Sequence, residues 1–148
     1  MNEYEKLLVL LTKNEIRFIV VGGFACVFNG HVRPTEDVDI IVDDHISNLK
    51  KLISVLSGYH DGYARELSVE DFPDEEGAVR LIEVFPIDIF TRINGKRYSD
   101  LTSHIRFHAL DGHKIPFLDA SMLVWFKEQS LRERDQMDVA ALKHLLKN

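Results

Sequence analysis

The stretch that most constrains this chain runs from residue 18 to residue 42 and arranges two short apolar runs around a pair of glycines and a pair of aspartates. The first run ends at Gly22 and Gly23, and the second carries Asp37 and Asp39 two residues apart. Because side chains alternate along a strand, Asp37 and Asp39 are predicted to project from the same face. Two neighbouring carboxylates repel each other unless a cation lies between them, so the pattern indicates a metal site.

The two glycines indicate a second ligand beside that metal. Glycine lets the main chain approach a ligand closely, and a helix that begins there directs free N–H groups at an anion. We therefore interpret the stretch as a site for metal and phosphate together. The alternative, that Gly22 and Gly23 only form a tight turn between a strand and a helix, stays open, and both interpretations can hold at once.

Composition sets limits on the class of protein. A chain of 148 residues with 45% hydrophobic and 28% charged residues is typical of a globular protein, and we expect one domain over residues 1–148. The net charge of −6 argues against a broad nucleic-acid-binding face. The first residues lack the basic start and apolar stretch of a signal peptide, and no apolar run approaches the roughly 20 residues that span a bilayer. We expect a cytoplasmic protein with no membrane contact and with Cys26 buried as a small apolar residue.

Helical and strand patterns alternate along the chain. The expected helices cover residues 3–14, 24–29, 46–56, 97–104, 119–129 and 133–146, and the expected strands cover residues 17–21, 37–42, 79–83, 85–90, 105–109 and 114–118. Residues 58–78 are acidic and rich in glycine, which predicts a mobile loop with a short helical turn near residues 68–72. In the last helix, the residues expected to face inward are Met137, Ala140, Ala141 and Leu145. This alternation favours an α/β or α+β fold in which helices pack against a sheet.

A third acid, Asp88, lies between Ile87 and Ile89 in a predicted strand. If that strand neighbours the one that carries Asp37 and Asp39, the three carboxylates converge beside the glycine turn. Three carboxylates with phosphate oxygens suit one or two Mg²⁺ ions, which indicates phosphoryl or nucleotidyl transfer. The alternative is that Asp88 is a buried acid paired with an arginine, either Arg80 or Arg92.

Several motifs in order resemble one superfamily. They are Gly22-Gly23, Arg33-Pro34-Thr35-Glu36-Asp37-Val38-Asp39, the lone acid Asp88, Lys127, Arg132 and Arg134-Asp135-Gln136-Met137-Asp138. Together they resemble the polymerase-β-like nucleotidyltransferases, and most nearly the small prokaryotic branch that includes toxins of the abortive-infection type. The resemblance spans residues 18–145 and implies the nucleotidyltransferase fold, a small mixed β-sheet flanked by helices, with a helical C-terminus.

The resemblance also implies a metal centre. Asp37 and Asp39 would hold the metal ions that bridge a nucleoside triphosphate, and Asp88 would complete the second metal site and help to activate the acceptor hydroxyl. The implied cofactor is Mg²⁺ or Mn²⁺, with two ions.

For the phosphates, the resemblance implies main-chain contacts from Gly22 and Gly23 to the β- and γ-phosphates, and charge neutralisation by Lys127 and Arg132. Many active members of the superfamily have Gly-Ser where this chain has two glycines, so the serine hydroxyl is missing at Gly23 while the main-chain donors remain.

For each of the remaining motif residues, a functional and a structural role are both open. Arg33 and Thr35 either contact substrate or shape their loop through hydrogen bonds. Arg134, Asp135 and Asp138 are either functional or structural, since Arg134 and Asp138 have the spacing of an ordinary ion pair along a helix.

The leading hypothesis is a nucleotidyltransferase that moves a nucleoside monophosphate from an NTP to a hydroxyl on tRNA, a protein or a small molecule and releases pyrophosphate. As a toxin it would have an antitoxin protein as a partner. A second hypothesis is a catalytically silent domain of the same fold that binds a nucleotide or a partner. A third is a metal-dependent phosphohydrolase, for which His31 and His45 are weak candidate ligands.

Overall fold

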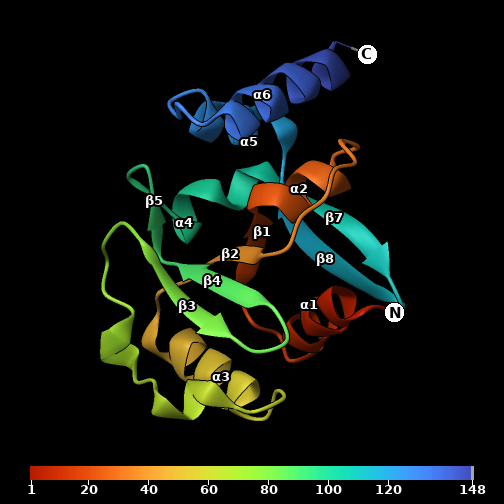
Figure 1. Ribbon diagram of the computed structural model, residues 1–148. Helices are drawn as coiled ribbons and strands as arrows, with labels where there is room; N and C mark the ends of the chain where they lie inside the picture. The colour runs from red at the N-terminus through yellow and green to blue at the C-terminus, as the bar shows by residue number, and fades with distance from the viewer. Residues whose placement is uncertain (148) are drawn as a thin grey trace.

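The computed structural model describes residues 1–147, which form a six-stranded mixed sheet with helices packed around it (Figure 1). The strand order is β3-β4-β2-β1-β8-β7. The six strands are β1 (Phe18–Val21), β2 (Val38–Val42), β3 (Ala78–Ile82), β4 (Pro86–Phe90), β7 (Ile105–Leu110) and β8 (His113–Leu118). Strand β1 runs antiparallel to β2 and parallel to β8, and β2 runs parallel to β4. The predicted α/β class with a small mixed sheet is confirmed.

The helices divide between two sides of the sheet. In Figure 1, α1 and α3 lie below the sheet, whereas α2, α5 and α6 lie above it. The α-helices are α1 (Glu3–Lys13), α2 (Gly22–Phe28), α3 (Ile46–Ser57), α4 (Tyr98–Leu101), α5 (Ala120–Lys127) and α6 (Glu133–Leu146). Short 3₁₀ turns are η1 (Tyr63–Glu66), η2 (Val69–Asp71) and η3 (Thr102–His104). The C-terminal helices α5 and α6 pack against each other, and α5 packs against α2, which in turn contacts β1 and β2.

The centre of the sheet is the most deeply buried part of the chain. All four residues of β1 are buried, as are Ile40, Ile41 and Val42 of β2. Because these residues are covered on both faces of the sheet, β1 and residues 40–42 of β2 are continuous apolar runs rather than alternating ones. Two of the surrounding helices begin at a polar capping residue: the side chain of Asn2 caps α1, and that of Asp119 caps α5.

Most predicted boundaries agree with the structure to within two residues. The helix predicted over residues 24–29 instead begins at Gly22, directly after β1, because Gly22 adopts a positive φ of 65° that turns the chain at once. The turn at Asn94 and Gly95 was expected, but the two short strands that it joins, β5 (Arg92–Ile93) and β6 (Lys96–Arg97), were not. The helical turn predicted near residues 68–72 is η2, and Cys26 is buried as predicted.

The inward face of α6 was predicted correctly at Leu145, which packs against the core, and wrongly at two other positions. Met137 is 63% exposed and Ala140 is also exposed, whereas the buried residues of this helix are Asp135, Asp138 and Leu142. Apolar spacing failed here because the acids point inward to meet basic side chains from elsewhere in the chain.

Among residues 1–147, no helix combines the length and the apolar character needed to cross a membrane.

Candidate active site

Asp39 and Asp88 lie directly opposite each other on neighbouring strands. Strands β2 and β4 pair in parallel with Asp39 in register with Asp88, and Asp37 immediately precedes β2. Asp37 and Asp39 also line a common cavity, as their two-residue spacing predicted. The structure thus brings the three predicted acids to neighbouring positions on β2, on β4 and in the loop just before β2.

The surroundings of Asp39 disfavour the ionised form of its carboxyl group. Burial, together with the negative charges of Asp88 and Asp37, raises the pKa of Asp39 to about 7. A carboxyl group with such a pKa is partly protonated at neutral pH, and a cation placed beside it would favour the charged form.

Arg80 supplies a cation to the other two acids. It lies opposite Asp88 on the neighbouring strand β3, and its Nε and Nη2 atoms donate to the two carboxylate oxygens of Asp88 at 2.8 and 2.9 Å. The same Nη2 also donates to Asp37 at 3.3 Å. Of the two arginines considered as partners of Asp88, it is therefore Arg80 that pairs with it, while Arg92 lies beside Asp74 at 3.3 Å.

Among residues 1–147, no group of three or more His, Cys, Asp or Glu side chains is arranged to hold a metal ion. The chemistry of the acids nevertheless suits a hard divalent cation, because Mg²⁺ prefers oxygen ligands, Asp39 and Asp88 lie in register, and the negative charges of Asp88 and Asp37 both act on Asp39. The raised pKa of Asp39 points the same way, since burial and the charges of Asp88 and Asp37 outweigh the opposing effect of the Lys127 charge.

Both glycines lie where a side chain would collide with this site. A Cβ on Gly22 would overlap the Asp39 carboxylate, and a Cβ on Gly23 would overlap Oγ1 of Thr35. Gly22 is also held at a positive φ, so two independent reasons require glycine there. The main chain at the start of α2 therefore lies in direct contact with Asp39.

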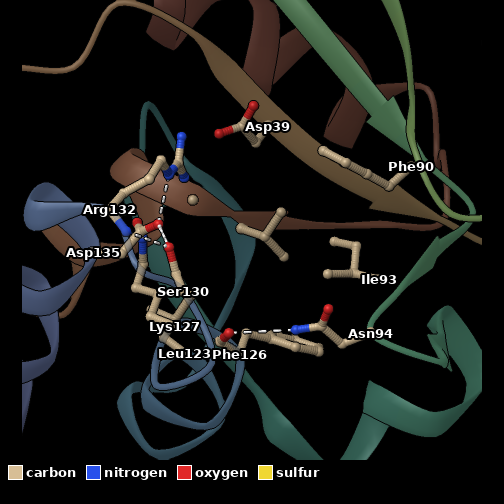
Figure 2. A pocket seen from close by; sticks show the side chains of 12 residues that line it. Asp39, Phe90, Ile93, Asn94, Leu123, Phe126, Lys127, Ser130, Arg132 and Asp135 are labelled. Carbon is tan, nitrogen blue, oxygen red and sulfur yellow. Dashed lines mark hydrogen bonds and ion pairs between the residues drawn. The ribbon is translucent and has the colours of Figure 1, made fainter.

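A cavity of about 270 Å³ opens beside Asp39, and we call it the Lys127 cavity. It is lined by Val21, Gly22, Asp39, Phe90, Ile93, Asn94, Leu123, Phe126, Lys127, Ser130, Arg132 and Asp135. Figure 2 shows that the charged groups of Lys127, Arg132 and Asp135 gather on one side of it, while Phe90 and Ile93 lie on the other. The cavity therefore pairs a charged wall with an apolar one, and Asp39 lies between them.

A second cavity, of about 540 Å³, also borders Asp39, and we call it the Arg134 cavity. It is lined by Gly23, Arg33, Pro34, Thr35, Glu36, Asp37, Asp39, Arg134 and Met137. Asp39 is the one residue that lines both of these cavities. Of the four predicted phosphate-binding residues, the Lys127 cavity contains Gly22, Lys127 and Arg132, whereas Gly23 faces the Arg134 cavity.

The acids of α6 hold the predicted phosphate ligands in a buried ionic network. Lys127 Nζ lies 3.0 Å from Asp135 Oδ1 and 3.0 Å from Asp138 Oδ2. Arg33 donates to both oxygens of Asp138 from Nε and Nη2, at 2.8 and 3.0 Å. Asp138 is fully buried, so the network joins the loop before β2 to the two C-terminal helices. Asp138 accordingly pairs with Arg33 and Lys127, and no ion pair with Arg134 is found in the described chain.

Asp135 is held as an anion by three donors. Burial alone would raise its pKa, but hydrogen bonds from Ser130, Lys127 and Arg132 outweigh it and lower the pKa of Asp135 to about 2. The Arg132 Nε atom donates to Asp135 at 2.8 Å, while 68% of the Arg132 side chain is exposed. Arg132 can therefore reach outward at little cost, whereas Lys127, only 11% exposed, is fixed in place.

The sequence alone had not indicated the apolar wall of the Lys127 cavity. Phe90 had a usable signal, because it follows Asp88 by two residues in the same strand and so shares its face. Asn94 could be placed in a turn but not beside Phe126, to whose carbonyl oxygen its side chain donates at 3.3 Å. That contact joins segments that are distant in sequence, so no local sequence pattern predicts it.

The same arrangement of sheet and helices is found in two solved structures described as nucleotidyltransferases. The lincosamide antibiotic adenylyltransferase LnuA, in a lincomycin-bound crystal structure, is similar with a TM-score of 0.59 and 18% identity, covering 98% of each chain. A protein from Thermotoga maritima described as a candidate nucleotidyltransferase is similar with a TM-score of 0.54 and 17% identity, covering 98% of this chain and 93% of the other. A scan against protein-family models and a search of curated protein sequences each give no match. At these identities the likeness shows the fold, as the resemblance in the sequence predicted.

Proposed function

We propose that this protein is a metal-dependent nucleotidyltransferase that moves a nucleoside monophosphate from an NTP to an acceptor hydroxyl and releases pyrophosphate. The observation that carries the proposal is the position of Asp39, which faces Asp88 across two strands and lines both the Lys127 cavity and the Arg134 cavity. A transfer reaction needs its donor and its acceptor on either side of the reacting phosphorus, and two cavities that meet at one carboxylate suit that need.

The nucleotide fits the Lys127 cavity best. Lys127 and Arg132 supply positive charge for the phosphates, and the main chain at Gly22 allows them to approach Asp39 closely. Phe90 and Ile93 supply an apolar wall for the base. Gly23 would add a main-chain N–H from the side of the Arg134 cavity.

Asp37, Asp39 and Asp88 are the residues proposed to hold Mg²⁺ or Mn²⁺. When bound, two such ions would neutralise phosphate oxygens and make the acceptor hydroxyl more acidic. In the transfer, the acceptor oxygen forms a bond to the α-phosphorus while the bond to the pyrophosphate oxygen breaks. Asp88 would help to accept the proton of the hydroxyl, and Lys127 and Arg132 would stabilise the negative charge on the departing pyrophosphate.

The acceptor is proposed to be a small molecule with a free hydroxyl group. A structural neighbour of nearly the same extent is described as an adenylyltransferase bound to lincomycin, which supports this class. The net charge of −6 weighs against tRNA. Transfer to RNA or protein, as by the toxin of a toxin–antitoxin pair, is the other acceptor class and is included in the test.

Arg80 favours a second candidate function, a catalytically silent domain that binds a nucleotide or a partner. Its guanidinium group occupies both oxygens of Asp88 and reaches Asp37, as a permanent structural ion pair would. A silent domain would bind NTP without transferring the nucleotide.

The test is incubation of the purified protein with each NTP labelled at the α-phosphate, with Mg²⁺ or Mn²⁺, and with separate acceptor pools. The pools are hydroxyl-bearing small molecules, total tRNA and mixed proteins. Wild type is compared with Asp39→Asn and with the control Asp111→Asn, which changes an acid in the exposed turn between β7 and β8. We expect label transfer to one pool by wild type and the control, and its loss in Asp39→Asn.

The outcomes separate the candidates. Binding of NTP with no transfer to any pool supports the silent domain. Absence of both binding and transfer in wild type contradicts the proposed function, and transfer to tRNA or protein overturns the small-molecule acceptor alone.

A further inference from the structure

Arg80 forms ion pairs with two of the three proposed metal ligands, Asp88 and Asp37. It projects from β3, the edge strand, directly opposite the nearly buried Asp88 on β4. The side chain of Asp88 is 11% exposed, while that of Arg80 is 52% exposed. The acid is therefore fixed by the fold, and the arginine has open solvent into which it can move.

The contacts of Arg80 use the same oxygen atoms that a metal ion would need. Both oxygens of Asp88 accept hydrogen bonds from it, and Oδ2 of Asp37 accepts a third. A guanidinium group matches carboxylates with a planar set of donors, so it can bridge two acids as a divalent ion does. It carries only one positive charge, however, and it makes no contact with Asp39 that would draw the three acids together.

We propose that Arg80 is a resident counter-ion that holds Asp37 and Asp88 in the metal-free protein and is displaced when a divalent ion binds. Arg80 is thus a positioning residue, which keeps the carboxylates ordered and sets the metal affinity by competition. This inference rests on the proposed function, because it takes these acids to be the metal ligands. It also accounts for the absence of a preformed three-acid metal site in residues 1–147.

The competition predicts a definite effect of removing the arginine. Without Arg80, the ion no longer has to displace a charge-assisted contact, and a nearby positive charge is gone, so affinity rises by about tenfold. In metal-free buffer the same change leaves Asp37 and Asp88 uncompensated, so the midpoint of thermal unfolding falls. A purely structural arginine would lower the unfolding midpoint without raising the metal affinity.

The experiment measures Mn²⁺ binding without nucleotide, from the electron paramagnetic resonance signal of free Mn²⁺, for wild type, Arg80→Gln and Arg80→Lys. The matched control is Arg17→Gln, which removes another half-exposed arginine that pairs with an aspartate, Asp43, at the far end of β2. We expect tighter binding in Arg80→Gln, an intermediate affinity in Arg80→Lys, and no change in Arg17→Gln. If Arg80→Gln does not fold, Arg80→Lys against wild type carries the comparison.

Equal or weaker Mn²⁺ binding in the Arg80 variants overturns the inference. If wild type still transfers labelled nucleotide in that case, the proposed function stands and only the role of Arg80 is wrong. If no variant binds Mn²⁺, with or without NTP, and no label is transferred, both the inference and the proposed function fail.

Discussion

The side chain of Thr35 occupies the space into which a Cβ on Gly23 would project, and its Oγ1 atom is the nearest to that position. Gly23 is buried and has no positive φ, so its neighbour rather than its own backbone requires a glycine there. The superfamily that the sequence resembles often has serine at this position. In this chain the hydroxyl beside the glycine turn belongs to Thr35 instead.

Gly23→Ser is therefore expected to destabilise the protein by about 1–3 kcal/mol, because the added side chain overfills a packed site. Thr35→Ala in the same chain should relieve most of that loss, because it removes the atom that collides. Urea unfolding of the two single variants and the double variant measures the coupling. Strictly additive effects would contradict the explanation.

Asp138→Ala is expected to lower the free energy of unfolding by about 3–5 kcal/mol, because it leaves the buried charges of Arg33 and Lys127 without a shared partner. Gln136→Ala, an exposed change on the same helix, should stay within about 0.5 kcal/mol of wild type. Chemical denaturation followed by circular dichroism provides both values. A loss below about 1 kcal/mol in Asp138→Ala would show that the network does not hold α6 in place.

The raised pKa of Asp39 predicts an unusual pH dependence of the free energy of unfolding in metal-free buffer. Its pKa in the folded protein, about 7, lies above its ordinary value of 3.8, so the folded state binds more protons between these pH values. The contribution of Asp39 to the free energy of unfolding is therefore largest below about pH 4 and is lost as pH rises through about 7.

Asp39→Asn removes that loss, so we expect the variant to be more stable than wild type at pH 8 by about 1–3 kcal/mol, and the difference to shrink toward pH 4. Unfolding curves recorded in EDTA at several pH values measure the difference. Asp111→Asn, at an exposed turn, serves as the control and should follow wild type throughout. A difference that does not vary with pH would mean that Asp39 does not titrate as its surroundings indicate.

Arg132→Gln tests the charged wall of the Lys127 cavity. The side chain is 68% exposed and donates to Asp135, which also accepts from Ser130 and Lys127, so stability should fall by less than about 1 kcal/mol. Under the proposed function, NTP binding should weaken by about tenfold, because one charge-assisted contact to phosphate is lost. Arg65→Gln, an exposed arginine on η1, should leave the affinity unchanged. Calorimetric titration with each NTP distinguishes the two variants.

Local patterns were sufficient for much of the fold. The glycine turn, the apolar strands and the helix caps depend on neighbouring residues, and the structure has them within two residues of the expected positions, apart from β5 and β6. The spacing of Asp37 and Asp39 was likewise enough to place both on one cavity, because alternation along a strand is a local property.

Other features depended on contacts between distant segments. The inward face of α6 was predicted wrongly at Met137 and Ala140. Arg33 and Lys127 make Asp138 a stable buried residue of this helix, and neither of them lies in it. The apolar wall of the Lys127 cavity likewise joins β4, the turn at Asn94 and α5.

The stretch from residue 18 to residue 42 by itself determined the glycine turn and the two aligned carboxylates, because both follow from backbone geometry over a few residues. Only the tertiary structure decided that Asp88 lies opposite Asp39, that Thr35 fills the space beside Gly23, and that Arg80 bridges Asp88 and Asp37. Strand pairing and ion-pair choice are set by which segments pack together. That choice depends on the burial energy of the whole chain rather than on any local pattern.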